Sequence, residues 1–255
     1  MTDITLKSLL EAGVHFGHQT RRWNPRMESF LFGDRGGVHI IDLEQTLGYL
    51  HEAQAFAERA AKEGGNVLFV GTKRQGKDII RSTAERIGMP YVTERWLGGF
   101  LTNFETIRRR IEQLQKLRAG KEAGEWEKLP KGEQAMKQRE LNRLETTLGG
   151  AAALEEPPAA LFVNDVAREK WAVAEAKKLG IPVIGVVDSN ANPDGIDYPI
   201  PGNDDAVSAI SLIVSAIASS VTAGHEAYQR SAKAAQEAAA KEAEAAEKKK
   251  KTKVV

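Results

Sequence analysis

Five aspartates make the segment Ile181–Asp205 strongly acidic and a candidate for cation binding. They are Asp188, Asp194, Asp197, Asp204 and Asp205, and because the segment has no Lys or Arg its net charge is −5. Asp188 ends an apolar run typical of a buried strand, and Asp204 and Asp205 precede a predicted helix. Aspartates in the first turn stabilise a helix by interacting with its dipole, and this role alone is enough to explain Asp204 and Asp205. The alternative is that carboxylates from the strand end and the helix start converge with a histidine to hold a divalent metal.

The octapeptide Gly71–Asp78 follows a predicted strand and opens a predicted helix, as a phosphate-binding P-loop does. It matches the first seven positions of G-x-x-x-x-G-K-[ST], but Asp78 replaces the hydroxyl that should hold Mg²⁺ and would repel phosphate. We therefore expect no nucleotide cofactor. The turn still offers helix N-terminal amides together with Lys73, Arg74 and Lys77, which suit an RNA backbone. An enzyme that processes a nucleotide or sugar phosphate at this turn is the alternative hypothesis.

Residues 15–27 interleave basic and aromatic side chains with Gly and Pro. The guanidinium groups of Arg21, Arg22 and Arg26 could bind phosphates in a bidentate manner, and the aromatic rings could stack on bases. A loop whose aromatic residues pack into the core and whose arginines are merely solvated explains the composition equally well.

A second group of arginines surrounds the start of a predicted helix. Arg95 lies shortly before it, and Arg108, Arg109 and Arg110 lie near its beginning. Three consecutive arginines point in different directions around a helix, so at least one faces solvent or a partner. We predict that these arginines contribute to RNA binding.

The composition restricts the chemistry of the chain. It has no Cys, which excludes disulfides, thiolate nucleophiles and Cys-ligated metal sites. The 36 Lys and Arg against 35 Asp and Glu give a net charge of +1, which excludes a uniformly cationic RNA-binding coat. The N-terminus has no secretory signal pattern. No Ser–His–Asp order or glycosidase-like carboxylate pair is evident, so these two kinds of catalytic site are not predicted.

Short apolar runs alternate with helical patterns along most of the chain. The predicted strands are 38–42, 66–71, 91–93, 160–164 and 181–188, and the predicted helices are about 43–62, 75–87 and 166–179, with another from 206. This alternation predicts an α/β fold of Rossmann or flavodoxin type, a parallel sheet with helices on both faces. Residues 1–103 and 149–224 are expected to form this domain.

Three other segments are predicted to be helical. Residues 104–148 have two narrow apolar stripes separated by Gly and Pro, which predicts an inserted antiparallel coiled-coil hairpin of net charge +3. Residues 206–223 are uncharged, but a polar stripe of Ser and Thr favours a helix packed on the sheet over a membrane span. Residues 225–255 are rich in Ala, Glu and Lys and predict a frayed helix with a disordered, Lys-rich tail.

Several motifs stand in one order along residues 2–224. They are His15-Phe16-Gly17-His18-Gln19-Thr20 with Trp23-Asn24-Pro25, Phe69-Val70-Gly71-Thr72-Lys73, Arg95-Trp96-Leu97-Gly98-Gly99 with Leu101-Thr102-Asn103, Asp188-Ser189-Asn190, Asn192-Pro193-Asp194-Gly195 and Ile200-Pro201-Gly202-Asn203-Asp204-Asp205-Ala206. Together they closely resemble the bacterial ribosomal protein S-two family of the small ribosomal subunit. The tail matches no family motif.

The resemblance implies a structural, non-enzymatic component of the small ribosomal subunit in the cytoplasm. It implies binding to small-subunit ribosomal RNA and to neighbouring ribosomal proteins, and no membrane partner. One expected neighbour is the large mRNA-binding protein built from OB-folds, whose docking supports translation initiation. For some family members a metal, expected to be zinc, is attributed to positions matching His18, Asp188, Asp204 and Asp205. All four residue types are present here, so one Zn ion is expected.

Overall fold

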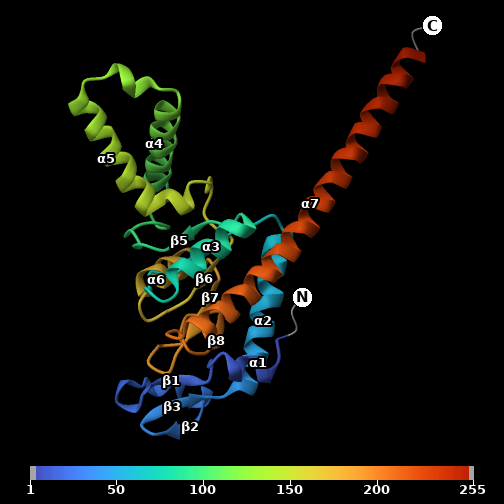
Figure 1. The fold of residues 1–255 in the computed structure, drawn as a ribbon. Helices are drawn as coiled ribbons and strands as arrows, with labels where there is room; N and C mark the ends of the chain where they lie inside the picture. The colour runs from blue at the N-terminus through green and yellow to red at the C-terminus, as the bar shows by residue number, and fades with distance from the viewer. Residues whose placement is uncertain (1–3, 253–255) are drawn as a thin grey trace.

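The computed structural model describes the backbone of residues 4–252 and the side chains of residues 4–233. Its larger sheet contains five strands in the order β5-β4-β6-β7-β8, and all neighbouring strands are parallel. The strands are β4 (Val67–Val70), β5 (Tyr91–Val92), β6 (Ala160–Val163), β7 (Val183–Val187) and β8 (Tyr198–Pro201). This sheet confirms the predicted α/β fold (Figure 1).

Both faces of this sheet are covered, because alternate strand residues enter different hydrophobic clusters. Val67 and Phe69 pack with α2 (Leu43–Lys62), α3 (Lys77–Ile87) and α7 (Val207–Thr252). Leu68 and Val70 pack on the opposite face, with α6 (Lys170–Leu179) and the residues that lead into α4 (Phe104–Glu122). The apolar runs are therefore continuous because each strand is buried on both sides.

The N-terminal residues form a second, antiparallel sheet that the sequence did not predict. After α1 (Leu6–Glu11), the strands β1 (Phe16–Gln19), β2 (Leu31–Arg35) and β3 (Val38–Ile41) pair in the order β1-β3-β2. The predicted strand 38–42 is β3, but its assignment to the parallel sheet was wrong. Gly36 and Gly37 both have positive φ and make the tight turn of a β2–β3 hairpin.

Strand β8 was also missed, since 181–188 was taken as the last clear strand. Pro199 and Pro201 within β8 lack backbone N–H donors and hide the strand pattern. The strand lies at the edge of the sheet, where such residues are tolerated.

Two helices project together from one end of the α/β domain (Figure 1). They are α4 and α5 (Lys131–Leu148), joined by a 3-10 turn at Glu125–Lys128. Ile111 and Leu114 of α4 are buried, as are Leu141 and Leu144 of α5. These residues match the predicted apolar stripes, and the coiled-coil geometry of the pair stays a prediction.

Helix α7 lies against the sheet and then continues beyond it (Figure 1). Its segment Val207–Lys233 is long and apolar enough to cross a membrane, but 56% of the apolar window is buried within the protein. Ile210, Ile213 and Ile217 are fully buried, as the Ser-striped helix predicted. The helix continues to Thr252, where the sequence predicted fraying and disorder. The side chains of the Lys-rich end lie outside the described residues.

Candidate functional site at the carboxyl edge of the parallel sheet

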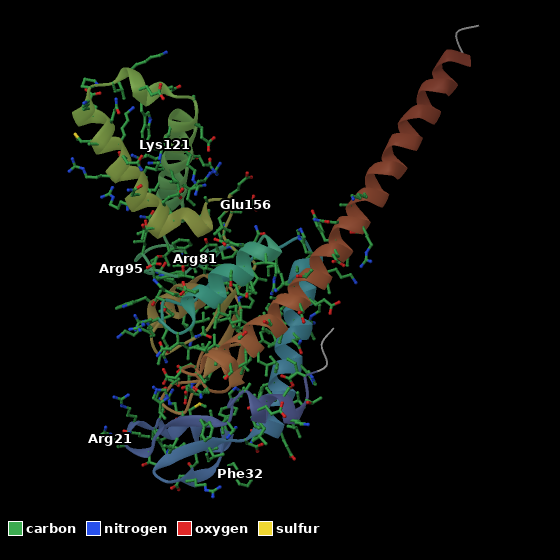
Figure 2. All side chains as sticks on the ribbon, viewed as in Figure 1. Arg21, Phe32, Arg81, Arg95, Lys121 and Glu156 are labelled. Carbon is green, nitrogen blue, oxygen red and sulfur yellow. The ribbon has the colours of Figure 1, made fainter. Side chains whose placement is uncertain are left out.

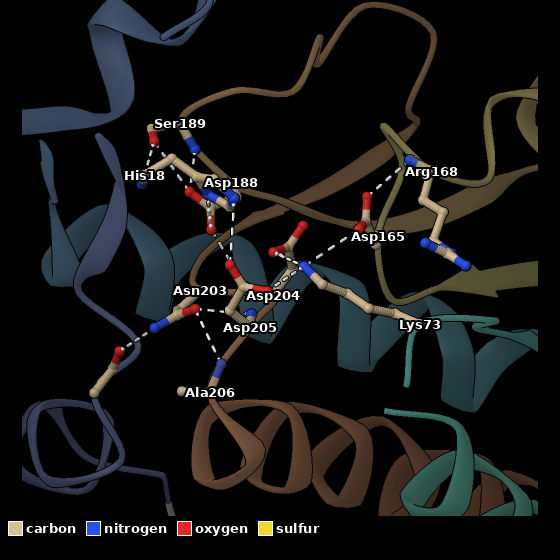
Figure 3. A network of polar contacts seen from close by, with 11 residues as sticks. His18, Lys73, Asp165, Arg168, Asp188, Ser189, Asn203, Asp204, Asp205 and Ala206 are labelled. Carbon is tan, nitrogen blue, oxygen red and sulfur yellow. Dashed lines mark hydrogen bonds and ion pairs between the residues drawn. The ribbon is translucent and has the colours of Figure 1, made fainter. Parts of the chain in front are cut away.

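The parallel strands end at a common edge where ionisable residues from distant parts of the chain meet (Figure 3). Lys73 follows β4, Asp165 follows β6, Asp188 follows β7, and Asp204 and Asp205 follow β8. The chain passes from β4 through α3 to β5 on one side of β4, and then from β5 through α4 and α5 to β6 on the other side. Lys73 and Asp165 therefore lie at the switch point where open α/β sheets place their binding sites.

The Lys73 ammonium group lies among three carboxylates. Its Nζ is 2.6 Å from Asp204 Oδ1, 2.6 Å from Asp205 Oδ1 and 3.4 Å from Asp165 Oδ2. Burial alone would lower the pKa of Lys73, but the hydrogen bonds to Asp204 and Asp205 outweigh it and raise that pKa above its ordinary value. Burial, with the nearby Asp165, raises the pKa of Asp204 to about 7 despite the lysine. One cation thus compensates a group of carboxylates that repel one another.

His18 on β1 brings the N-terminal sheet to this edge. Its Nδ1 is 3.0 Å from Asp188 Oδ2, and its Nε2 is 3.3 Å from Asp205 Oδ2. The hydrogen bond to Asp188 raises the pKa of His18 above its ordinary value, although burial opposes it. The His18 backbone N–H donates to Ser189 Oγ at 2.7 Å, and the Asn24 N–H donates to the Ser189 carbonyl at 2.8 Å. These contacts fasten the two sheets together.

The predicted metal ligands lie together. One ligand atom from each of His18, Asp188 and Asp204 lies within 4.8 Å of the others, and Asp205 contacts the same imidazole. An imidazole nitrogen with carboxylate oxygens is a donor set that Zn²⁺ accepts. The residues therefore fit the expected metal. Because Lys73 already holds Asp204, a bound metal would compete with this ammonium group for the same carboxylate.

The turn after β4 is filled by interactions within the protein. The backbone N–H of Thr72 donates to Glu169 Oε1 at 2.9 Å, and Lys77 Nζ lies 3.1 Å from Glu94 Oε1. The hydrogen bond from Lys77 lowers the pKa of Glu94. Lys73 and Lys77 therefore contact carboxylates in the structure, whereas the sequence predicted that both contact RNA phosphates.

Five of the predicted RNA-binding arginines are exposed and make no ion pair among the described side chains. They are Arg21, Arg22, Arg74, Arg95 and Arg110. Arg21 and Arg22 lie in the 3-10 turn that follows β1, and Arg21 donates from Nε to the side chain of Gln19. In Figure 2, Arg21 and Arg95 both lie on the left-hand side of the view.

The other predicted arginines are exposed but paired. Arg26 forms an ion pair with Asp194, beyond β7. Arg108 and Arg109 pair with glutamates one turn away on α4. Exposed pairs of this kind contribute little free energy, so a phosphate can replace the carboxylate at low cost.

Glu175 on α6 holds the loop that precedes α4. Its carboxylate accepts hydrogen bonds from the backbone N–H groups of Gly99, Leu101 and Thr102, at 2.8, 2.9 and 3.1 Å, and from the Trp96 indole at 3.1 Å. Burial alone would raise the pKa of Glu175, but these donors lower it below its ordinary value. The Arg95–Asn103 motif is thereby fixed against α6.

Sequence reasoning missed Asp165 and Glu175 as partners of the site. Asp165 follows a buried strand closely, as Asp188 does, and that shared position was a usable signal. Glu175 lies in the middle of a helix, and its role depends on a loop that is distant in sequence, so no local pattern indicates it.

Comparison with known proteins agrees with these observations. The sequence profile of the family described as Ribosomal protein S2 matches residues 9–224. The chain is 50% identical over 227 residues to the small ribosomal subunit protein uS2 of Nocardia farcinica, which covers 89% of this chain and 80% of the relative. It is 53% identical over 229 residues to the uS2 protein of Coprothermobacter proteolyticus, covering 90% and 85% respectively.

These relatives are structural ribosomal proteins rather than enzymes, as the sequence motifs predicted. The match spans the α/β domain and the inserted helices. It also includes the group of ionisable residues at the carboxyl edge of the sheet, here called the edge cluster, which consists of His18, Lys73, Asp165, Asp188, Asp204 and Asp205. This chain belongs to the ribosomal protein S2 family.

Proposed function

We propose that the chain is held in the small ribosomal subunit by binding ribosomal RNA through its exposed, unpaired arginines. The observation that supports this most directly is the contrast among the basic residues. Lys73 and Lys77 are engaged by carboxylates, whereas Arg21, Arg22 and Arg95 are exposed without ion pairs among the described side chains. An exposed cation that forms no ion pair is available to a phosphate group.

The near-neutral total charge is consistent with this proposal, because part of the acidic charge is paired with a cation inside the protein. Three aspartates of the edge cluster, Asp165, Asp204 and Asp205, are compensated by Lys73. Their negative field is therefore partly offset within the protein, while the exposed arginines present positive charge to the solvent.

Binding of purified small-subunit ribosomal RNA at several salt concentrations tests this proposal. The double variant Arg21→Glu, Arg22→Glu should lower the affinity, and the slope of log affinity against log salt should fall by about 1 to 2. Arg59→Glu, at an exposed arginine on α2 outside the predicted RNA-binding residues, serves as a control for charge reversal at another position. An unchanged affinity and slope in the double variant would contradict the assignment.

Family membership supports a second part of the proposal: in the cytoplasmic ribosome, the chain helps to dock the large mRNA-binding protein built from OB-folds and so supports initiation. Small subunits depleted of this chain should bind less of that protein and recover it when the chain is added back. Equal binding to depleted and restored subunits would contradict this role.

We also propose that His18, Asp188, Asp204 and Asp205 hold one zinc ion. The convergence of His18, Asp188 and Asp204 supports it, and Asp205 contacts the other nitrogen of the same imidazole. When bound, the ion would supply a positive charge that cross-links β1 to the ends of β7 and β8. His18 would act as a neutral ligand, and Asp204 would exchange Lys73 for the metal.

A further inference from the structure

Trp171 on helix α6 is a large aromatic side chain that packing does not explain. It is 66% exposed, whereas Trp96 and Trp126 are each 8% exposed and Trp23 is half-buried. The neighbouring residue on the inner face, Ala172, is fully buried against the sheet. Helix α6 is therefore anchored through its small residues, and its tryptophan faces away from the core.

The exposed surface of α6 is cationic. Lys170, Lys177 and Lys178 are exposed, and the Lys170 ammonium nitrogen lies 5.8 Å from the centroid of the Trp171 ring. The one acidic residue within α6, Glu175, is occupied by hydrogen bonds from the Gly99–Thr102 loop. The helix thus presents a tryptophan among lysines without a competing carboxylate of its own.

The loops beside α6 add further cations. Glu175 binds the indole of Trp96, which fixes the adjacent Arg95 near the helix. Arg168, just before α6, is exposed and donates from Nε to Thr72 Oγ1 at 2.9 Å. Arg74 is exposed two residues beyond Thr72. Arg95, Arg74 and Arg168 follow the ends of the neighbouring strands β5, β4 and β6. Arg168 is positioned by its hydrogen bond to Thr72, and the other two lie within two residues of a side chain with a hydrogen bond of this kind.

We propose that α6 and these loops form an RNA-binding surface on which Trp171 stacks against an unpaired base, while lysines of α6 bind the adjacent phosphates. This inference rests on the proposed function and names the nucleic-acid feature that is recognised. A flat aromatic side chain bordered by cations matches a base and its phosphates, since stacking needs an exposed ring and phosphates need nearby positive charge. Lysines are depleted in protein–protein interfaces, which favours RNA over a protein partner.

Binding of the full-length chain to intact small-subunit ribosomal RNA, measured by gel mobility shift, tests the inference. Trp171→Ala should weaken binding by about 5- to 150-fold, the range expected for loss of one base–aromatic stack. Trp171→Phe keeps an aromatic face and should retain most of the affinity. Leu179→Ala removes another exposed apolar side chain at the end of α6 and should bind as the native chain does.

The outcomes separate this inference from the general proposal. Native affinity in Trp171→Ala, with reduced affinity in Arg21→Glu, Arg22→Glu, would overturn the stacking role and leave the proposed function standing. Native affinity in both variants would overturn both. Normal RNA affinity with reduced occupancy of Trp171→Ala in small subunits would assign the tryptophan to a protein partner and also overturn the inference. Unchanged unfolding curves for Trp171→Ala would confirm that the variant is folded.

Discussion

The Lys73 ammonium nitrogen lies 2.6 Å from a carboxylate oxygen of Asp204, joining the turn after β4 to the turn after β8. Strands β6 and β7 lie between these two strands in the sheet. A turn that resembles a phosphate-binding loop therefore serves to hold the far edge of the sheet in place.

Replacing Lys73 should destabilise the protein strongly. Lys73→Met keeps the length of the side chain but removes the charge, which leaves Asp204 and Asp205 facing each other without compensation. Breaking a buried ion pair by removing one partner costs about 3–5 kcal/mol, and urea unfolding should show a loss of that order. Lys178→Met, at an exposed lysine, should change the free energy of unfolding by less than about 0.5 kcal/mol. Equal effects of the two substitutions would contradict the compensating role of Lys73.

Zinc content should depend on the edge cluster. Purified native protein dialysed against zinc should retain about one ion per chain by elemental analysis, and Asp204→Asn should retain much less, because the donor set then loses a carboxylate. Asp194→Asn changes an aspartate of the same segment that pairs with Arg26 outside the cluster, and it should retain the metal. Absence of zinc from the native protein would remove the proposed site.

Two glycines should respond to alanine in opposite directions. A Cβ atom on Gly224 would lie 2.2 Å from the backbone oxygen of Glu58, where α7 packs on α2, so Gly224→Ala should cost about 1–3 kcal/mol. Gly48 lies within α2 with nothing within 4 Å of an added Cβ. Because glycine weakens a helix interior, Gly48→Ala should gain about 0.5–1 kcal/mol. Thermal and urea unfolding measure both changes, and a stabilising Gly224→Ala would refute the close approach.

The Glu175 contacts predict a pH-dependent contribution to stability. Its folded-state pKa lies below the ordinary value of 4.5, so its stabilisation is present above that value and is lost as the pH falls through the lower folded pKa. Glu175→Gln replaces the carboxylate that accepts from these backbone N–H groups with an uncharged amide. The free energy of unfolding should therefore fall by about 1–3 kcal/mol near neutral pH.

Urea unfolding at about pH 6.5 and about pH 4 should therefore show a smaller difference between native protein and Glu175→Gln at the lower pH. Glu226→Gln, at an exposed residue of α7, is the control and should differ little at either pH. A difference that grows on acidification would reverse the expected sign and refute the account of Glu175.

The parallel sheet could be predicted because its strands carry their own signal. Val67–Val70 and Ala160–Val163 are apolar at every position, since both faces of the sheet are covered. The antiparallel sheet and β8 could not be recognised in the same way. β2 is largely exposed and β8 contains two prolines, so neither has the apolar pattern of a buried strand.

The histidine and three of the aspartates in the edge cluster were predictable, but Asp165 and the contacts of Lys73 were not. His18, Asp188, Asp204 and Asp205 were identified from motifs and positions, and the structure brings them together. Lys73 was expected to face RNA, because its sequence neighbours resemble a phosphate-binding turn. Asp204, which Lys73 contacts, lies 131 residues further along the chain, and Asp205 follows it. The two turns come together only because the order of the strands brings β4 and β8 into one sheet.

Occupancy of the chain in small ribosomal subunits tests the central claim most directly. Subunits depleted of the native chain are incubated with native protein, with Arg21→Glu, Arg22→Glu, or with Arg59→Glu, and are sedimented at low and high salt. The exposed-arginine account predicts that the double variant is lost from the subunits, increasingly with salt, while Arg59→Glu remains bound. Equal occupancy of all three proteins in salt-washed subunits would contradict it.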